Sequence, residues 1–239
     1  MTKDTEAINA QSTSEDFEFE ALTQAVNYRR SLIHEFSPYL TGNILEVGAG
    51  IGQFTAELLL APNVKSVHAV EPDARFYSKL IEQNLKIQST CGTVADIDSQ
   101  TKFDAIVSVN VLEHIENHSD ELKRYHEHLR PGGHLCLFVP ACPSIYAPID
   151  KTFGHYRRYK RRELHQLLVG AAFQVVKLYY FNSLGFFAWW FNFCFLKKTY
   201  FEVGKVKFYD RQIFPVIHAI ESSGLRPPLG QSLLAIARF

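Results

Sequence analysis

The stretch LEVGAGIGQF, residues 45–54, decides which fold the sequence predicts. It joins an apolar strand expected over residues 43–47 to a helix expected over residues 53–60. Glycines let a backbone turn tightly and approach a ligand closely, because no Cβ atom is in the way. The amide groups of such a loop, and the N-terminus of the helix that follows, then face that ligand. We therefore expect this loop to form the ligand-binding edge of an open α/β sheet.

The spacing of the loop argues against a bound dinucleotide. The dinucleotide fingerprint is GxGxxG, whereas here the glycines follow GxGxG, and Gln53 stands at the position of the third glycine. Glu46 comes just before the loop, where its carboxylate would repel a pyrophosphate but attract an ammonium or sulfonium group. Glu71, 19 residues after Gly52, is expected to end the second strand. A carboxylate at that place can accept both hydroxyls of a ribose.

Expected strands and helices alternate along the chain. We expect strands over residues 43–47, 66–70, 92–95, 103–109, 134–139, 173–181 and 232–237, and helices over residues 21–39, 53–60, 73–83, 119–129 and 161–170. Strands separated by such helices imply crossover connections and a parallel sheet. The predicted fold class is α/β: a doubly wound, Rossmann-like, seven-stranded and mostly parallel sheet, with helices on both faces and a helical lid insertion.

The chain divides into a polar start and one large domain. We expect residues 1–20 to form a flexible leader and residues 21–239 to form a single domain. Residues 182–228 are an aromatic-rich lid or insert between the last two strands, and residues 181–195 have Phe or Trp at eight of 15 positions. A helix that is apolar on all sides is buried, or it meets another chain or a membrane surface. Core packing and a lid over an apolar substrate are compatible interpretations.

Composition excludes several classes of protein. The 25 Lys and Arg residues balance 25 Asp and Glu residues, so the field that would attract nucleic acid is lacking. The four cysteines form no CxxC pair, which argues against a zinc ribbon or a thioredoxin-type site and favours a cytoplasmic location. We expect no transmembrane segment, because the most apolar run, residues 186–196, is too short. Peripheral contact with anionic lipids is allowed by Lys197, Lys198, Lys205 and Lys207.

Five motifs in order resemble one enzyme family. They are the glycine loop, the acidic residue Glu71, Ala-Asp-Ile at residues 95–97, FDAIVSVNVLEHI at residues 103–115 and LRPGG at residues 129–133. This series, over residues 25–140, resembles the class I S-adenosylmethionine-dependent methyltransferases, in a branch that acts on small molecules. The resemblance implies S-adenosyl-L-methionine as cofactor and S-adenosyl-L-homocysteine as product.

The resemblance also implies which residues hold the cofactor. The methionine part would lie against Glu46, Gly48, Ala49 and Gly50, in a loop shaped by Gly52, Gln53 and Phe54. Glu71 would hold the ribose, with Pro72 beside the adenine, while Asp96 (or Asp98) and Ile97 would contact the base. The transferable methyl would lie near Asn110, Val111 and His114. Tyr28 and Arg29 resemble part of a helix that closes over the methionine carboxylate.

Residues 146–159 are the best place to look for the reaction, because they follow the carboxyl end of the fifth strand. We expect His155 to be a general base, with Tyr156 and His114 as further catalytic candidates. Arg157 and Arg158 would hold a carboxylate or phosphate, or else begin the solvated face of the next helix. Tyr146, Phe186 and Trp190 complete the expected substrate site. No pattern of His and carboxylate residues indicates a metal site.

The function predicted is methyl transfer to a small, partly apolar molecule, with O-methylation slightly preferred over N-methylation. Two other classes stay open: an NAD(P)-dependent oxidoreductase, and a non-catalytic binding module that keeps the cofactor fold. Gln53 in the glycine loop counts against the oxidoreductase, and the intact loop with Glu71 and Asp96 counts against the module. The sequence predicts neither the substrate nor the oligomeric state.

Overall fold

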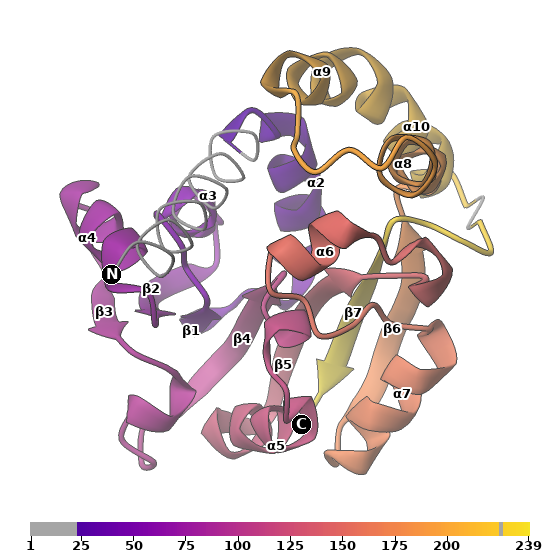
Figure 1. Ribbon diagram of the computed structural model, residues 1–239. Coiled ribbons are helices and arrows are strands. Elements are labelled where there is room, and N and C mark those ends of the chain that lie inside the picture. Colours follow the sequence, from indigo (N-terminus) through magenta and orange to yellow (C-terminus); the bar gives the residue numbers. More distant parts are fainter. Residues whose placement is uncertain (1–22, 225–226) are drawn as a thin grey trace, which may run out of the picture.

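The computed structural model describes residues 23–224 and 227–239 (Figure 1). Within these residues seven strands form one sheet, in the order β3-β2-β1-β4-β5-β7-β6. The strands are β1 (Gly42–Val47), β2 (Val64–Glu71), β3 (Gln88–Cys91), β4 (Phe103–Val109), β5 (Leu129–Pro140), β6 (Gln174–Phe181) and β7 (Ser232–Arg238). Neighbours among β1 to β5 run parallel, while β7 runs antiparallel to both β5 and β6. The predicted mostly parallel α/β sheet is therefore confirmed.

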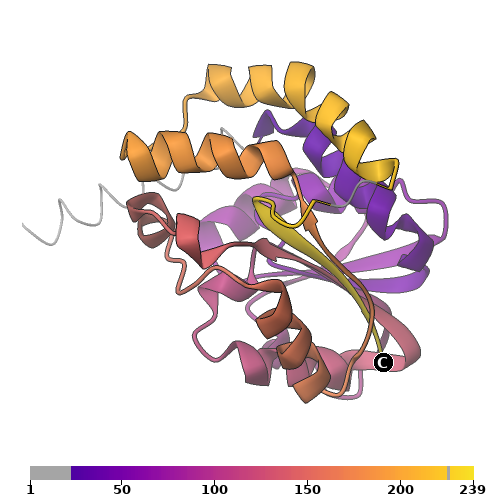
Figure 2. The same ribbon diagram turned by 90° about the vertical axis from the view of Figure 1, so that its right-hand side faces the viewer.

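Helices cover both faces of the sheet (Figure 2). Successive side chains of a strand point to opposite faces, so Ile44 packs with α2 (Val26–Phe36) and α3 (Gln53–Leu58), whereas Leu45 packs with α5 (His118–His128) and α7 (Arg161–Gly170). The helix α4 (Ala74–Glu82) follows β2 and begins at Asp73, whose side chain accepts a hydrogen bond from the Arg75 amide. Two apolar cores on either side of the sheet thus fix the strand ends that carry the loops.

One expected strand was placed too late in the sequence. The third strand is β3 (Gln88–Cys91) in place of the expected residues 92–95, and residues 94–96 form a 3₁₀ turn. The carboxylate of Asp96 accepts hydrogen bonds from the amide and the hydroxyl of Thr93, which closes that turn. The fifth strand, β5, begins at Leu129 rather than at residue 134 as expected, and the other strands match their expected bounds within two residues. The helix α2 ends within three residues of its expected end, and the expected leader, residues 1–20, lies outside the described residues.

The insert forms two helical stretches above one end of the sheet, beside α2 (Figures 1 and 2). The first is α8 (Ser183–Trp189), which continues as a π-helix over Trp190–Phe195. The second is α9 (Val203–Phe208), which passes through a π-helix over Tyr209–Ile213 into α10 (Phe214–Ser222). A short helix, α6 (Pro148–Thr152), lies in the loop after β5. In the described part of the chain, no helix combines the length and the apolar character needed to cross a bilayer.

A buried carboxylate of the insert anchors the N-terminus of α2. Asp210, 2% exposed, accepts hydrogen bonds from the backbone amides of Asn27 at 3.0 Å and Tyr28 at 2.9 Å. The Asn27 side chain in turn donates to the Asp210 carbonyl. The first amides of a helix lack partners inside that helix, and a negative charge there is favourable. Asp210 therefore ties the insert to the helix that carries Tyr28 and Arg29.

We expect Asp210→Ala to lower the free energy of unfolding by about 1–3 kcal/mol, because two buried amides lose a charged acceptor. Chemical denaturation of the full chain measures this effect. Glu127→Ala, which removes an exposed carboxylate on α5, is the matched control. Equal stability of the Asp210 variant and the control would contradict the anchoring role.

Candidate active site

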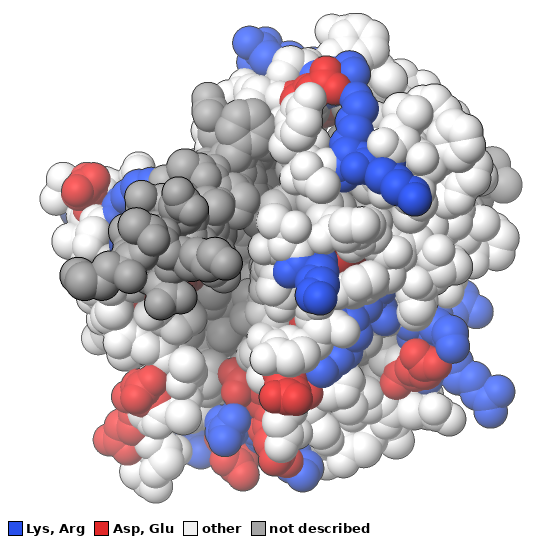
Figure 3. Space-filling view, viewed as in Figure 1, with Lys and Arg blue, Asp and Glu red and all other residues white. Residues whose placement is uncertain are grey.

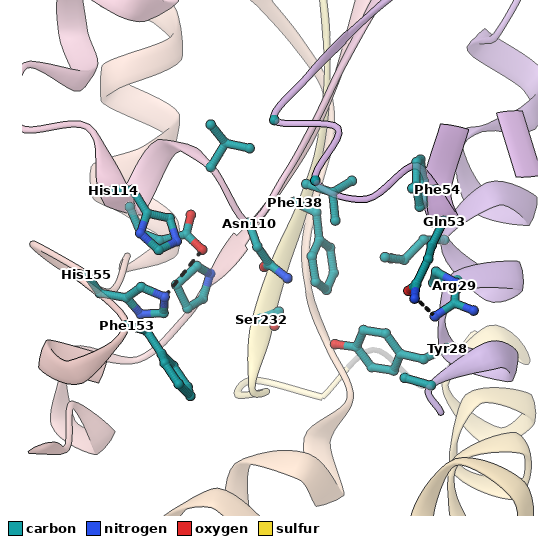
Figure 4. A pocket seen from close by; sticks show the side chains of 18 of the residues that line it. Tyr28, Arg29, Gln53, Phe54, Asn110, His114, Phe138, Phe153, His155 and Ser232 are labelled. Atoms are coloured by element: carbon teal, nitrogen blue, oxygen red, sulfur yellow. Dashed lines mark hydrogen bonds and ion pairs between the residues drawn. The ribbon is translucent and has the colours of Figure 1, made fainter. Parts of the chain in front are cut away.

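A cavity of about 1010 Å³ lies at the carboxyl ends of β1, β2 and β4. Its walls come from distant parts of the sequence: the loop after β1, the turn after β2, the loops after β4 and β5, the helix α2 and the insert. Figure 4 shows Tyr28, Arg29, Gln53 and Phe54 on one side, and His114, Phe153 and His155 on the other. The cavity thus sits at the edge of the sheet where ligands bind in open α/β folds.

The glycine loop owes its shape to backbone conformations that favour glycine. Gly48 has φ +72°, and a Cβ atom there would lie 2.4 Å from Val111 Cγ2. Gly52 has φ +87° and is the N-cap residue of α3. A side chain at either position would strain the left-handed backbone. The loop therefore brings its backbone close to the end of β4 because its glycines have no side chains.

Glu71 joins the glycine loop to the turn after β2. Its carboxylate accepts hydrogen bonds from the Gly50 amide at 2.8 Å and from the Asp73 amide at 2.9 Å. Burial raises the pKa of Glu71, while the two hydrogen bonds act in the opposite direction. One side chain at the cavity wall thus fixes two loops relative to each other.

Glu46 lines the cavity and has a buried carboxylate oxygen. Its Oε2 has no hydrogen-bond partner within the described part of the chain, and the residue is 3% exposed. Burial is the main cause that raises the pKa of Glu46 to about 8. A buried polar atom normally has a partner, and a cationic group bound in the cavity would supply one. The residues present therefore fit a ligand that carries an ammonium group.

On the α2 side, polar side chains form a chain of hydrogen bonds. Arg29 donates from Nη1 to Gln53 Oε1 at 3.2 Å, and Gln53 donates from Nε2 to the Thr23 hydroxyl at 2.6 Å. Burial is the main cause that lowers the pKa of Arg29. The ring of Tyr28 packs edge-on against Phe138 and Phe181. This wall combines a cation with aromatic rings.

On the opposite side, Asp150 orients His155. Asp150 is fully buried, its Oδ1 lies 3.0 Å from His155 Nδ1, and the same oxygen accepts hydrogen bonds from Arg158, with Nη2 at 2.8 Å. Burial alone would raise the pKa of Asp150, but the contacts with His155 and Arg158 outweigh burial and lower it. Asp150 is therefore ionised at neutral pH, and it holds the imidazole ring of His155 in one orientation.

A second histidine packs against the first. The rings of His114 and His155 meet edge-to-face with centroids 4.7 Å apart, and the Nε2 atom of His155 lies 4.0 Å from Glu113 Oε1. Burial, and then repulsion from His155, lowers the pKa of His114 to about 4, so His114 is neutral at pH 7. Asn110, at the end of β4, has φ +53° and lies between these residues and Phe138 (Figure 4).

A family model described as "Methyltransferase domain" matches residues 22–178, well over half of the chain. The chain belongs to the class I S-adenosylmethionine-dependent methyltransferases. This membership agrees with the glycine loop, with Glu71 and with the open acceptor at Glu46. It decides against the alternative of a nicotinamide-dependent oxidoreductase.

Curated relatives match part of this chain. It is 30% identical to the ubiquinone biosynthesis O-methyltransferase of Rickettsia conorii over 152 residues, 56% of this chain and 52% of that one. It is 28% identical to an uncharacterized methyltransferase of Bacillus cereus over 130 residues, 53% of this chain and 58% of that one. The chain thus spans about half the length of the curated relatives it matches.

Solved methyltransferase structures share the fold. One is phosphoethanolamine N-methyltransferase 2 of Haemonchus contortus, in complex with S-adenosyl-L-methionine, with a TM-score of 0.62 at 14% identity. The match covers 89% of this chain and 52% of that chain. The 1,6-didemethyltoxoflavin-N1-methyltransferase of Burkholderia thailandensis has a TM-score of 0.61 at 20% identity, and covers 100% of this chain and 90% of its own. At these identities the likeness concerns the fold.

Most of the cofactor residues expected from the sequence line the methyltransferase cavity. They are Tyr28, Arg29, Glu46, Gly48, Ala49, Gly50, Gln53, Phe54, Glu71, Pro72, Asn110, Val111 and His114. Their individual contacts with the cofactor stay predictions. Three expected residues lie outside the lining among the described residues: Gly52 caps α3, the exposed Asp96 closes its own turn, and Ile97 packs in the core. Residues 92–95, which directly precede Asp96, do line the cavity.

Some of the expected catalytic and substrate residues line the cavity, and others do not. His155, His114 and Arg158 line the cavity, whereas Tyr156 is 55% exposed and lies outside the lining. Arg158 is 5% exposed, so it is not part of a solvated face. Its guanidinium is held by Asp150 and lies 4.3 Å from the centroid of the Trp189 ring. Arg158 therefore holds the buried Asp150 carboxylate in place.

The remaining substrate candidates do not line the cavity. Arg157 donates to the carbonyl oxygens of Ile115 and Glu116, and the Tyr146 hydroxyl donates to the His155 carbonyl. Phe186 is partly buried against the insert core, and Trp190 is 47% exposed. None of these four residues is among those that line the cavity, and their roles in substrate binding stay predictions.

Several lining residues were not anticipated. Phe138, Phe153, Trp189 and Phe193 give the cavity an apolar part. Trp189 and Phe193 are buried, whereas the neighbouring Trp190 is 47% exposed, and helical spacing alone did not tell which side faces the cavity. Asp150, beneath His155, carried no sequence signal beyond its position five residues before the histidine.

The sequence did not foresee a cluster that could hold a metal ion. Donor atoms of Glu113, His114 and His155 all lie within 4.8 Å of one another. A carboxylate with two imidazoles is a donor set that transition metals accept. The expectation of no metal site stays a prediction, and a chelator tests it below.

We expect Glu46→Gln to remove a pH-dependent destabilisation of the ligand-free methyltransferase. The pKa of Glu46 rises from 4.5 to about 8 on folding, so the unfolded state loses its proton first, and the free energy of unfolding falls as pH rises through that interval. The variant should gain stability relative to the wild type between about pH 5 and about pH 8. Urea denaturation at both pH values measures the difference, and a pH-independent difference would contradict this pKa.

Proposed function

We propose that this methyltransferase transfers the methyl group of S-adenosyl-L-methionine to a hydroxyl group of a small, partly apolar molecule, and that His155 is the general base. The observation that carries the proposal is the hydrogen-bonded pair of Asp150 and His155 at the wall of the cavity, next to His114.

Methyl transfer needs little from the protein besides alignment and exclusion of water, because the sulfonium already activates the methyl carbon. A base is required when the acceptor must lose a proton, as a hydroxyl does. The fold places His155 on the wall opposite Tyr28 and Arg29 (Figure 4). A substrate between the two walls would have its acceptor beside the imidazole ring.

The surroundings of His155 suit the role of a base. Because Asp150 is ionised, the Nδ1 atom of His155 donates to it, which leaves Nε2 as the acceptor for a substrate proton. Asp150 then stabilises the imidazolium that forms, as the aspartate does in a Ser-His-Asp triad. Arg158 keeps Asp150 in place from the other side, so Asp150 and Arg158 are positioning residues.

The lining supports a substrate with an apolar body. Phe138, Phe153, Trp189 and Phe193 line the cavity, and the ring of Phe153 lies 6.2 Å from that of His155. Small-molecule sites are mostly apolar with a few polar groups that fix orientation. The Rickettsia conorii relative is named an O-methyltransferase, whereas two structural neighbours are named N-methyltransferases. The assay below therefore tests whether the methyl group goes to oxygen or to nitrogen.

We expect His155→Ala to lower kcat about 100-fold or more while binding of S-adenosyl-L-homocysteine is retained, because a general base contributes about 10²–10⁴-fold. Asp150→Asn should lower kcat with a smaller effect on KM. The assay measures transfer of radiolabelled methyl from S-adenosyl-L-methionine to a panel of apolar alcohols, phenols and amines. His165→Ala, an exposed histidine on α7, is the matched control.

Two results would contradict the proposal. Transfer to amines alone, unaffected by His155→Ala, would assign N-methylation without a base. Loss of transfer after treatment with a chelator, restored by a divalent cation, would instead make Glu113, His114 and His155 metal ligands. Binding of the cofactor product without transfer to any acceptor would favour the non-catalytic module.

A further inference from the structure

One side of the first insert helix is exposed and apolar. It consists of residues 37–63% exposed on α8 and just beyond, called the aromatic stripe here: Leu184, Phe187, Trp190, Phe191, Phe195 and Leu196. The rings touch one another, since Phe195 stacks with Trp190 at 5.9 Å and with Phe191 at 5.8 Å between centroids. The stripe is therefore a continuous surface, whereas scattered apolar residues on a protein surface are ordinary.

The fold does not need the aromatic stripe for its own packing. The other side of the same helix supplies Trp189 and Phe193, which pack with Ile145, Ala147 and Ile149. Trp189 also donates from its indole nitrogen to the Ile145 carbonyl at 3.1 Å. The helix is thus already attached to the domain, and the stripe points away from that attachment.

Positive charge accompanies the stripe. Lys197 follows it directly and is exposed, as are Lys205, Lys207 and Arg211 along α9 and the π-helix after it. Residues 183–222, all of which the structure describes, have three acidic side chains: Glu202 is paired with Lys198 and Lys205, and Asp210 and Glu221 are buried. Figure 3 shows Lys and Arg side chains gathered between α9 and α8, amid uncharged residues.

We propose that the aromatic stripe and these basic residues dock the protein on the surface of a bilayer that contains anionic lipids. Amphipathic helices with aromatic residues on one side and Lys or Arg beside them lie in the membrane interface. Trp and Tyr favour the level of the headgroups, and Tyr200, 55% exposed, follows Lys198 closely in the sequence. Each lysine near an anionic leaflet adds about 1 kcal/mol of attraction.

A second copy of the chain is the less favourable occupant. A two-fold interface places the same surface of both copies face to face. The basic residues beside the stripe would then find no free acidic partner on the facing surface, since Glu202 is already paired with lysines. A bilayer with anionic headgroups accepts the same charges favourably.

Docking of this kind would place the cavity beside the bilayer. The helix that presents the stripe on one side lines the cavity on the other, through Gly185, Ala188, Trp189 and Phe193. One helix thickness thus separates the membrane surface from the apolar part of the site. The proposal does not depend on the proposed function, because docking requires neither cofactor nor turnover.

Vesicle sedimentation with the full chain tests the proposal. We expect the protein to bind vesicles of phosphatidylcholine with phosphatidylglycerol at least about tenfold more tightly than vesicles of phosphatidylcholine alone. The triple variant Trp190→Ser/Phe191→Ser/Phe195→Ser should lose binding to both vesicles. Lys197→Glu/Lys207→Glu should lose the preference for anionic lipid.

Matched controls keep the experiment decisive. Leu60→Ser/Ile81→Ser removes exposed apolar groups elsewhere, and Lys86→Glu reverses an exposed charge elsewhere; both should bind like the wild type. Circular dichroism shows whether each variant is folded, and the charge variant tests the proposal if the triple variant is not. Absence of binding to either vesicle, binding unchanged by the stripe and charge variants, or self-association through the stripe without vesicle binding would overturn the proposal.

Discussion

The carboxylate of Glu71 is the constraint on which the rest of the site depends. It accepts the amides of Gly50 and Asp73 and so connects the loops that leave two neighbouring parallel strands. The backbone positions of the glycine loop are possible because Gly48 and Gly52 adopt left-handed conformations. Burial disfavours the charge of Glu71 and raises its pKa, and hydrogen bonds to that charge compensate in part. The Glu71 side chain therefore connects the order of the strands, the shape of the glycine loop and the location of the cavity.

Different parts of the fold hold the parts of the site in place. The Glu46 and Glu71 side rests on the sheet, whereas Tyr28 and Arg29 depend on α2, whose N-terminus is anchored by Asp210 of the insert. The insert also supplies Trp189, which lies over the guanidinium of Arg158. Buried charges thus connect α2, His155 and the apolar part of the cavity to the insert and its neighbouring loop, and the proposed docking surface occupies the outer side of the same insert.

The sequence predicted what local chemistry determines. Glycine spacing, the acidic residues at strand ends and the apolar strands placed Glu46, Glu71 and Asn110 correctly at the cavity, because parallel strands bring their carboxyl ends to one edge. The role expected for Asp96 did not follow, since a carboxylate three residues after Thr93 closes a turn instead. The partners of Arg157 and Arg158, the Ile115 carbonyl and Asp150, were not predictable, because they become neighbours only through the tertiary fold.

The most direct test of this account is the thermal stabilisation of the protein by S-adenosyl-L-homocysteine. A ligand at a hundredfold excess over its Kd adds about 2.7 kcal/mol to the stability of the native state. The account predicts such a stabilisation for the wild type and for Glu82→Ala, an exposed carboxylate on α4, and its loss in Glu71→Ala. Equal stabilisation of the Glu71 variant, or stabilisation by NADH in place of the homocysteine nucleoside, would contradict the central claim.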